Sequence, residues 1–99
     1  MKPMTLTAAQ RRFLKQQAHH LKPLMHIGKE GPSAPFMRQV EEQIGAHELI
    51  KMRVLGNCLS EPSEIEAAMN GVGVTIVQKV GHIYTLFRQK SENSNFELT

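Results

Sequence analysis

The chain contains 99 residues, of which 40% are hydrophobic and 21% are charged, and its formal net charge is +3. This length and composition fit one globular domain and exclude a largely disordered or low-complexity chain. They also exclude a membrane-spanning protein, because the longest uncharged run, residues 67–78, is about half of the ~20 apolar residues that a spanning helix needs.

The first predicted helix begins after Thr7, which is spaced with Gln10 as a capping box, and it ends before Pro23. Helical periodicity predicts a buried face formed by Phe13, Leu14, Ala18 and Leu21. A different face carries a basic stripe of Arg11, Lys15, His19 and Lys22. This stripe is either a contact surface for a polyanion or an ordinary solvated face.

An apolar run at residues 24–27 predicts a strand, and the tetrapeptide Gly28-Lys29-Glu30-Gly31 follows at once. Two glycines around a lysine are typical of loops in which the backbone approaches a phosphate, because glycine adopts positive φ and has no side chain in the way. The same spacing also occurs in plain tight turns. On its own the motif is therefore a weak signal.

A second helix is predicted to start near Ser33, with Pro35 in its first turn, and to end at Gly45. Its expected buried face is formed by Phe36, Met37, Val40 and Ile44. Residues 48–55 then alternate, with Ile50, Met52 and Val54 on one side and Lys51 and Arg53 on the other. We expect a strand with one face on the core and one basic face.

A short third helix is predicted from a possible capping box, Ser63-Glu64-Ile65-Glu66, and it should stop at Asn70-Gly71. Two runs at 72–78 and 83–88 predict a hairpin around residues 79–82. The predicted order is α-β-α-β-α-β-β, a single α/β domain over residues 1–90 with a mixed four-stranded sheet and packed helices. Its first two strands should be parallel and its last two antiparallel, and residues 91–99 should form a flexible polar tail.

Five segments of the chain together resemble the CRM domain, the chloroplast RNA splicing and ribosome maturation module, in its stand-alone bacterial, YhbY-type form. These segments are Leu21-Lys22-Pro23, Ile27-Gly28-Lys29-Glu30-Gly31, His47-Glu48-Leu49-Ile50-Lys51, Val77-Gln78 followed by Val80-Gly81, and Leu86-Phe87-Arg88. They extend from the first helix to the last strand. As a set they are far more specific than the glycine motif alone.

This resemblance implies a fold similar to the C-terminal domain of bacterial translation initiation factor three, and it implies RNA binding. Single-domain bacterial members associate with precursors of the large ribosomal subunit, so we expect ribosomal RNA as the partner, with no membrane and no DNA. The G-x-x-G loop of the family resembles that of KH domains, which clamps the nucleic-acid backbone. The residues predicted to contact RNA are Arg11, Lys15, Lys22, Gly28, Lys29, Gly31, Lys51, Arg53 and Arg88.

Two other classes of function are a protein-interaction module and an enzyme. A small protein-interaction module that docks an acidic partner remains an alternative. A catalytic role lacks a carboxylate cluster or general-base constellation, so we do not expect an enzyme. The five histidines contain no i, i+4 pair, and the single cysteine, Cys58, has no second thiol, so we expect no metal and no cofactor.

Cys58 cannot form an internal disulfide, which agrees with a reducing compartment, and no secretory signal is visible before Arg11. We therefore expect a cytoplasmic protein. A monomer is the expectation, although the sequence leaves a dimer open.

Overall fold

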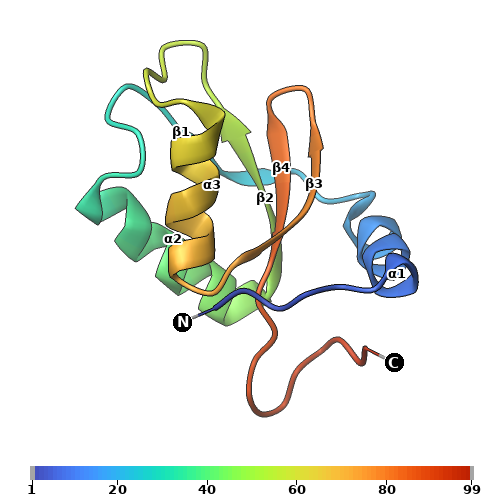
Figure 1. Ribbon diagram of the computed structural model, residues 1–99. Helices are drawn as coiled ribbons and strands as arrows, with labels where there is room; N and C mark the ends of the chain where they lie inside the picture. The colour runs from blue at the N-terminus through green and yellow to red at the C-terminus, as the bar shows by residue number, and fades with distance from the viewer. Residues whose placement is uncertain (1, 99) are drawn as a thin grey trace.

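The computed structural model describes residues 2–98, and in these residues three helices accompany a four-stranded sheet (Figure 1). In chain order the elements are α1 (Ala8–Ala18), β1 (Pro23–Ile27), α2 (Ala34–His47), β2 (Leu49–Val54), α3 (Pro62–Gly71), β3 (Thr75–Val80) and β4 (Ile83–Phe87). The predicted α-β-α-β-α-β-β order and the mixed sheet are confirmed.

The strands lie in the order β1-β2-β4-β3. β1 and β2 are parallel, as expected for strands joined by a helix, and β4 is antiparallel to both β2 and β3. The predicted hairpin therefore places its second strand, β4, in the middle of the sheet beside β2. The pairing of β3 with β4 contains a register shift between Ile76 and Gln78.

The helix starts follow the predicted caps in two cases out of three. Thr7 and Gln10 form the expected capping box, and the Ser33 side chain accepts a hydrogen bond from the Phe36 amide. The third prediction was wrong, because α3 begins after Glu61 and not at Ser63. Pro62 favours the first helical position, which moves the cap to the residue before it.

The predicted end of the second helix at Gly45 was also wrong. α2 continues through Gly45 to His47, and it stops where Glu48 adopts a φ of 65°. A residue other than glycine rarely takes this conformation unless tertiary contacts hold it. The contacts at Glu48 come from the C-terminal segment and are described below.

The two faces of the sheet carry separate hydrophobic clusters. One face packs against α2 and α3, with Val40, Ile44, Ile65 and Met69 buried over the strands. The other face is covered at one end by α1, where Leu14 and Ala18 pack on Leu49, Val77 and Phe87.

Fewer residues of α1 pack on the sheet than the sequence predicts. Phe13 was expected to be buried, but 37% of it is exposed. Its neighbours are at the C-terminus, where Glu97 and Leu98 line a small hollow with it. Leu14 and Ala18, which are four residues apart, make the contact with the sheet.

The C-terminal segment differs from the flexible tail that the sequence predicts. Phe96 and Leu98 pack against the α1 cluster, and the Phe96 ring meets Phe87 edge to face at a centroid distance of 5.6 Å. In Figure 1 this segment curves back beneath the sheet toward α1. Up to Leu98 the tail is therefore part of the packed domain, and Thr99 lies outside the described residues.

A fully buried carboxylate holds this tail in place. The Glu48 side chain accepts hydrogen bonds from the Lys90 amide at 2.9 Å, the Asn95 amide at 2.8 Å and the Ser94 hydroxyl at 2.6 Å. Burial raises the pKa of the Glu48 carboxyl, but the hydrogen bonds outweigh burial, so the pKa lies below its usual value. Glu48 thus joins the end of α2 to the tail as a charged acceptor.

Candidate nucleic-acid interface

The glycine loop is a tight turn whose two glycines have different roles. The Gly31 amide donates to the Gly28 carbonyl at 3.0 Å, which places Lys29 and Glu30 at the exposed tip. Gly31 has a φ of 62°, and a Cβ added there would lie 2.2 Å from the Ser60 Oγ. Gly31 is therefore required both by its conformation and by the neighbouring loop.

Gly28 is under no such requirement. Its φ is not positive, and an added Cβ would make only ordinary contacts, at 3.5 Å from Asn57 and 3.6 Å from Leu55. The sequence predicted that both glycines supply positive-φ conformations. For Gly28 this prediction was wrong. The space around Gly28 is still compatible with a close backbone approach.

Three loops lie at the same end of the sheet, toward the top of Figure 1. They are the 28–31 turn, the 55–60 loop and the 80–83 hairpin turn. The Leu55 amide donates to the Ile27 carbonyl at 2.9 Å, and the Val54 amide donates to the His82 carbonyl at 2.7 Å. We call this region the loop end. Lys29 and His82 are exposed there.

Glu30 lies beside Lys29 in the turn, so the turn itself carries no net charge. The positive charge near it comes from β2. Arg53 is exposed and pairs in register with His26, two residues before Gly28. Lys29 and Arg53 are therefore both exposed cations at or near the loop end.

The basic side of β2 faces away from α2 and α3, as the alternation predicts. Ile50 and Met52 are buried in the cluster under those helices, whereas Lys51 is half-buried and Arg53 is exposed. Lys51 pairs with Pro23 on β1 and with Thr85 on β4. We call the sheet surface beyond α1 the open face, and it comprises His26, Lys51 and Arg53, with Lys15, His19 and Lys22 at its border.

The basic stripe of α1 divides into residues that face solvent and one that does not. Lys15 and His19 are exposed, and with Arg12 and Gln78 they line a shallow hollow of about 470 Å³ between α1 and β3. Lys22, after the helix, is also exposed. Arg12 was not among the predicted RNA contacts, although its spacing of three residues from Lys15 places both on one side of a helix.

Arg11 points into the structure. Its Nη1 donates to the Ile76 carbonyl at 2.9 Å and also to the Val77 carbonyl. These carbonyls lie where the register of β3 and β4 shifts. Arg11 therefore ties α1 to β3, and this geometry favours a structural role over an RNA contact.

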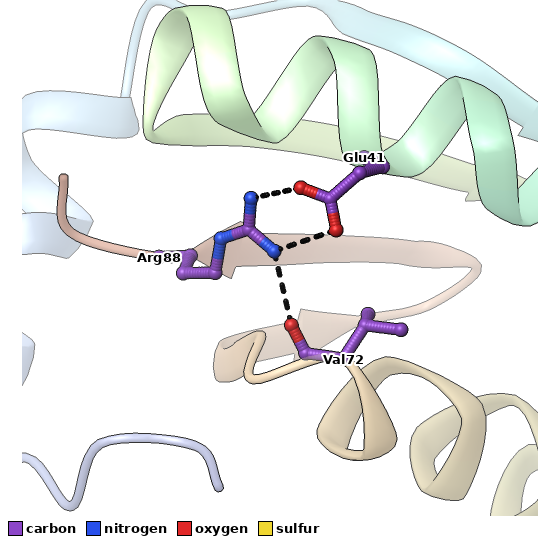
Figure 2. Close-up of polar contacts among 3 residues, drawn as sticks. All are labelled: Glu41, Val72 and Arg88. Carbon is purple, nitrogen blue, oxygen red and sulfur yellow. Dashed lines mark hydrogen bonds and ion pairs between the residues drawn. The ribbon is translucent and has the colours of Figure 1, made fainter. Parts of the chain in front are cut away.

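Arg88 is likewise occupied within the protein (Figure 2). Its guanidinium forms a two-pronged ion pair with Glu41 of α2, and its Nη1 also donates to the Val72 carbonyl at 3.0 Å. The hydrogen bond from Arg88 lowers the pKa of Glu41, and the same pairing raises the pKa of Arg88. Arg88 thus joins β4 to α2 and α3, on the side away from the open face.

The described residues contain no gathering of three or more His, Cys, Asp or Glu side chains close enough to hold a metal ion. Between Lys2 and Leu98, no helix has both the length and the apolar character to cross a bilayer.

Comparisons with known proteins identify the same module. Residues 6–88 match the family model of the CRS1 / YhbY (CRM) domain. The chain is 38% identical over 94 residues to the Bacillus subtilis protein named "Probable RNA-binding protein YqeI", covering 94% of this chain and 98% of that one. It is 35% identical over 89 residues to a Haemophilus influenzae protein named "RNA-binding protein", covering 89% and 90% of the two chains.

A solved structure shares the fold. The solution structure of a hypothetical protein from Staphylococcus aureus superimposes with a TM-score of 0.77 at 30% sequence identity, covering 96% of this chain and all of the other. The agreement over nearly the full length of both chains supports the element order and sheet described above.

Proposed function

Because the chain belongs to the CRS1/YhbY (CRM) domain family, we propose that it binds RNA through the loop end and the open face. The observation that carries this proposal is the β1–β2 register, which aligns Arg53 with His26 near the glycine turn and Lys51 with Pro23 near Lys22. Cationic side chains therefore follow the two strands from one end to the other. Such a track suits a phosphate backbone, which binds cations largely without regard to sequence.

The specific partner we propose is ribosomal RNA in precursors of the large subunit, bound in the cytoplasm during assembly. The relatives named as RNA-binding proteins support the RNA part of this proposal. In our assignment Lys29 and Arg53 contact phosphates, and Lys15, Lys22, Lys51 and Arg12 extend the contact. Gly31 shapes the turn, while Gly28 leaves room for the backbone of the RNA.

Arg11 and Arg88 act in this scheme as positioning residues, because their guanidinium groups are bonded to backbone carbonyls and to Glu41. We propose a binding role without catalysis. The cations of the open face are spread along two strands and a helix, which suits an extended ligand better than a single reacting group.

The salt dependence of binding tests this function. The purified protein should bind ribosomal RNA in a filter or gel assay, and its affinity should fall as salt rises. If about four phosphates are neutralised, the slope of log K against log salt should be on the order of −3. A flat response would overturn the electrostatic basis of the proposal.

The alternative, docking onto an acidic protein, predicts a different response to nuclease. A protein that binds large-subunit precursors should co-sediment with them in cell extracts and be released by ribonuclease. An acidic protein partner would stay bound after the same treatment. Crosslinking in cells, followed by sequencing of the attached RNA, would then identify the segment.

A further inference from the structure

We propose that the hollow between α1, the start of β1, the end of α2 and the tail receives one unpaired RNA base. This inference rests on the proposed function and deepens it, because it names a class of RNA: a stem with a bulged or looped-out nucleotide. The hollow has a volume of about 490 Å³, within the range of about 300–1,000 Å³ that is typical of small-ligand sites.

The walls of the hollow are mostly apolar, although it is open to solvent. Leu49 and Phe96 line it, and so does Leu24, which is 54% exposed on the edge strand β1. The Phe96 ring is held by its edge-to-face contact with Phe87, so the aromatic wall is already in place. An apolar hollow with a few polar groups at its border is the usual form of a small-ligand site.

The polar groups at its border identify the occupant. His20, Lys22 and His47 line the hollow together with Gln17, and no Asp or Glu is among its described lining residues. Lys22 is the charged group among these described lining residues, and its ammonium attracts a phosphate. A nucleotide satisfies both parts of this site, because it joins a flat apolar base to a charged phosphate.

Known RNA recognition uses the same combination of groups. Unpaired bases stack on aromatic or histidine side chains, and their edges form hydrogen bonds with side-chain amides. Phe96 and the two histidines supply such surfaces, Gln17 offers both a donor and an acceptor, and Lys22 can neutralise the adjoining phosphate.

The position of the hollow also fits an RNA that follows the open face. The hollow lies at the start of β1, and the glycine turn lies at the end of β1. Five residues of strand separate them, a span on the order of 15 Å. Lys51 and Arg53 lie on the neighbouring strand along this path. One RNA stem could therefore contact Lys29 at one end and insert a bulged base at the other.

The test compares two RNA hairpins that differ at one position. One carries a single bulged 2-aminopurine, and the other is the same hairpin fully paired. The parent protein should bind the bulged hairpin roughly tenfold more tightly, the order of effect expected for one stacked base. The 2-aminopurine fluorescence should change on binding.

Leu24→Ser should reduce the ratio of affinities for the bulged and the paired hairpin to about one. Because Leu24 is exposed, the melting temperature should stay nearly unchanged. Phe96→Leu keeps apolar volume but removes the aromatic surface, and it should weaken the preference and the fluorescence change. Met4→Ser is the control, because it also replaces an exposed apolar side chain by serine but lies outside the proposed binding surface, and it should keep the tenfold ratio.

Equal, salt-dependent binding of both hairpins by the parent would overturn this inference and leave the proposed function standing. Binding of neither hairpin, nor of ribosomal RNA, would overturn both. A preference that survives Leu24→Ser and Phe96→Leu would place the base elsewhere and also contradict the inference.

Discussion

The two ends of the sheet are stabilised in different ways. At the loop end, short turns are closed by local backbone hydrogen bonds, and charged side chains such as Lys29 and Arg53 remain exposed. At the opposite end, the buried Glu48 carboxylate binds three groups of the tail, and Phe96 packs on Phe87. The two ends therefore differ in what their residues do: the loop end presents exposed cations for phosphates, whereas the tail end stabilises the fold and its Phe96 forms one wall of the hollow proposed for a base.

Changes at Glu48 and its hydrogen-bond donors should therefore reduce stability and spare the affinity of the folded protein for fully paired RNA. Changes on exposed side chains at the loop end should do the reverse. Gly31 is the instructive exception, because it belongs to the loop end but has a constrained conformation.

The largest expected effect comes from removing the tail. A chain that ends at Lys90 loses the packing of Phe96 and two donors to Glu48, which should lower the free energy of unfolding by about 3–4 kcal/mol. Thermal unfolding should show a drop in melting temperature of about 15 °C. A chain that ends at Phe96 is the matched control and should lose far less. If the chain ending at Lys90 melted like the parent, the tail would be dispensable, as its polar sequence had predicted.

Glu48→Ala should have the next largest effect. It removes the acceptor of three partly buried hydrogen bonds and leaves their donors without this partner, at a cost of about 3 kcal/mol. Glu48→Gln keeps the shape and one acceptor oxygen, so we expect an intermediate loss. Glu42→Ala, at an exposed glutamate of α2, should change stability by no more than about 0.5 kcal/mol. Equal melting temperatures for Glu48→Ala and Glu42→Ala would show that the tail is held in some other way.

Gly31→Ala and Gly28→Ala form a matched pair within the turn. The first forces an alanine to a φ of 62° and against Ser60, so it should destabilise the protein by about 1–2 kcal/mol. The second meets only ordinary contacts and should stay within about 0.5 kcal/mol of the parent. Denaturant unfolding measures both. Similar losses for the two variants would contradict the different roles assigned to the glycines.

Lys29→Glu should separate binding from stability. The side chain is exposed, so the melting temperature should stay nearly unchanged, while the new carboxylate repels a phosphate at the loop end. RNA affinity should fall, and the slope of log K against log salt should become shallower by about one. Arg38→Glu, an exposed charge reversal on α2, is the control and should bind RNA more tightly than Lys29→Glu. If Lys29→Glu bound like the parent, the 28–31 segment would be only a turn.

Local patterns in the sequence predicted the element order, two of the three helix caps and the outward direction of Lys51 and Arg53. Each of these depends on residues a few positions apart. The tail contact could not be predicted in this way, because Glu48 meets its donors across 42 to 47 residues of sequence. The partners of Arg11 and Arg88 within the protein could not be predicted for the same reason. Their carbonyl partners are set by tertiary packing, and a basic residue in a sequence does not show whether its charge is already in use.

Acid should loosen the tail end before the loop end. The folded-state pKa of Glu48 lies below the usual 4.5, so its contribution to stability is complete above that value. As the pH falls from about 4.5 through the folded-state pKa, the unfolded chain takes up the proton more readily and this contribution is lost. Glu41, paired with Arg88, has a shift of the same sign and adds to the acid dependence.

Amide exchange measured by NMR between pH 7 and pH 3 can distinguish the two ends. After correction for intrinsic exchange rates, the Lys90 and Asn95 amides, which donate to Glu48, should lose protection at a higher pH than the Gly31 amide, which donates to a backbone carbonyl. In Glu48→Gln this difference should largely disappear, because the glutamine does not titrate, while Glu41→Gln should preserve it. Simultaneous loss of protection at all three amides in the parent would mean that acid unfolds the domain as one unit, and that the two ends of the sheet are not independent.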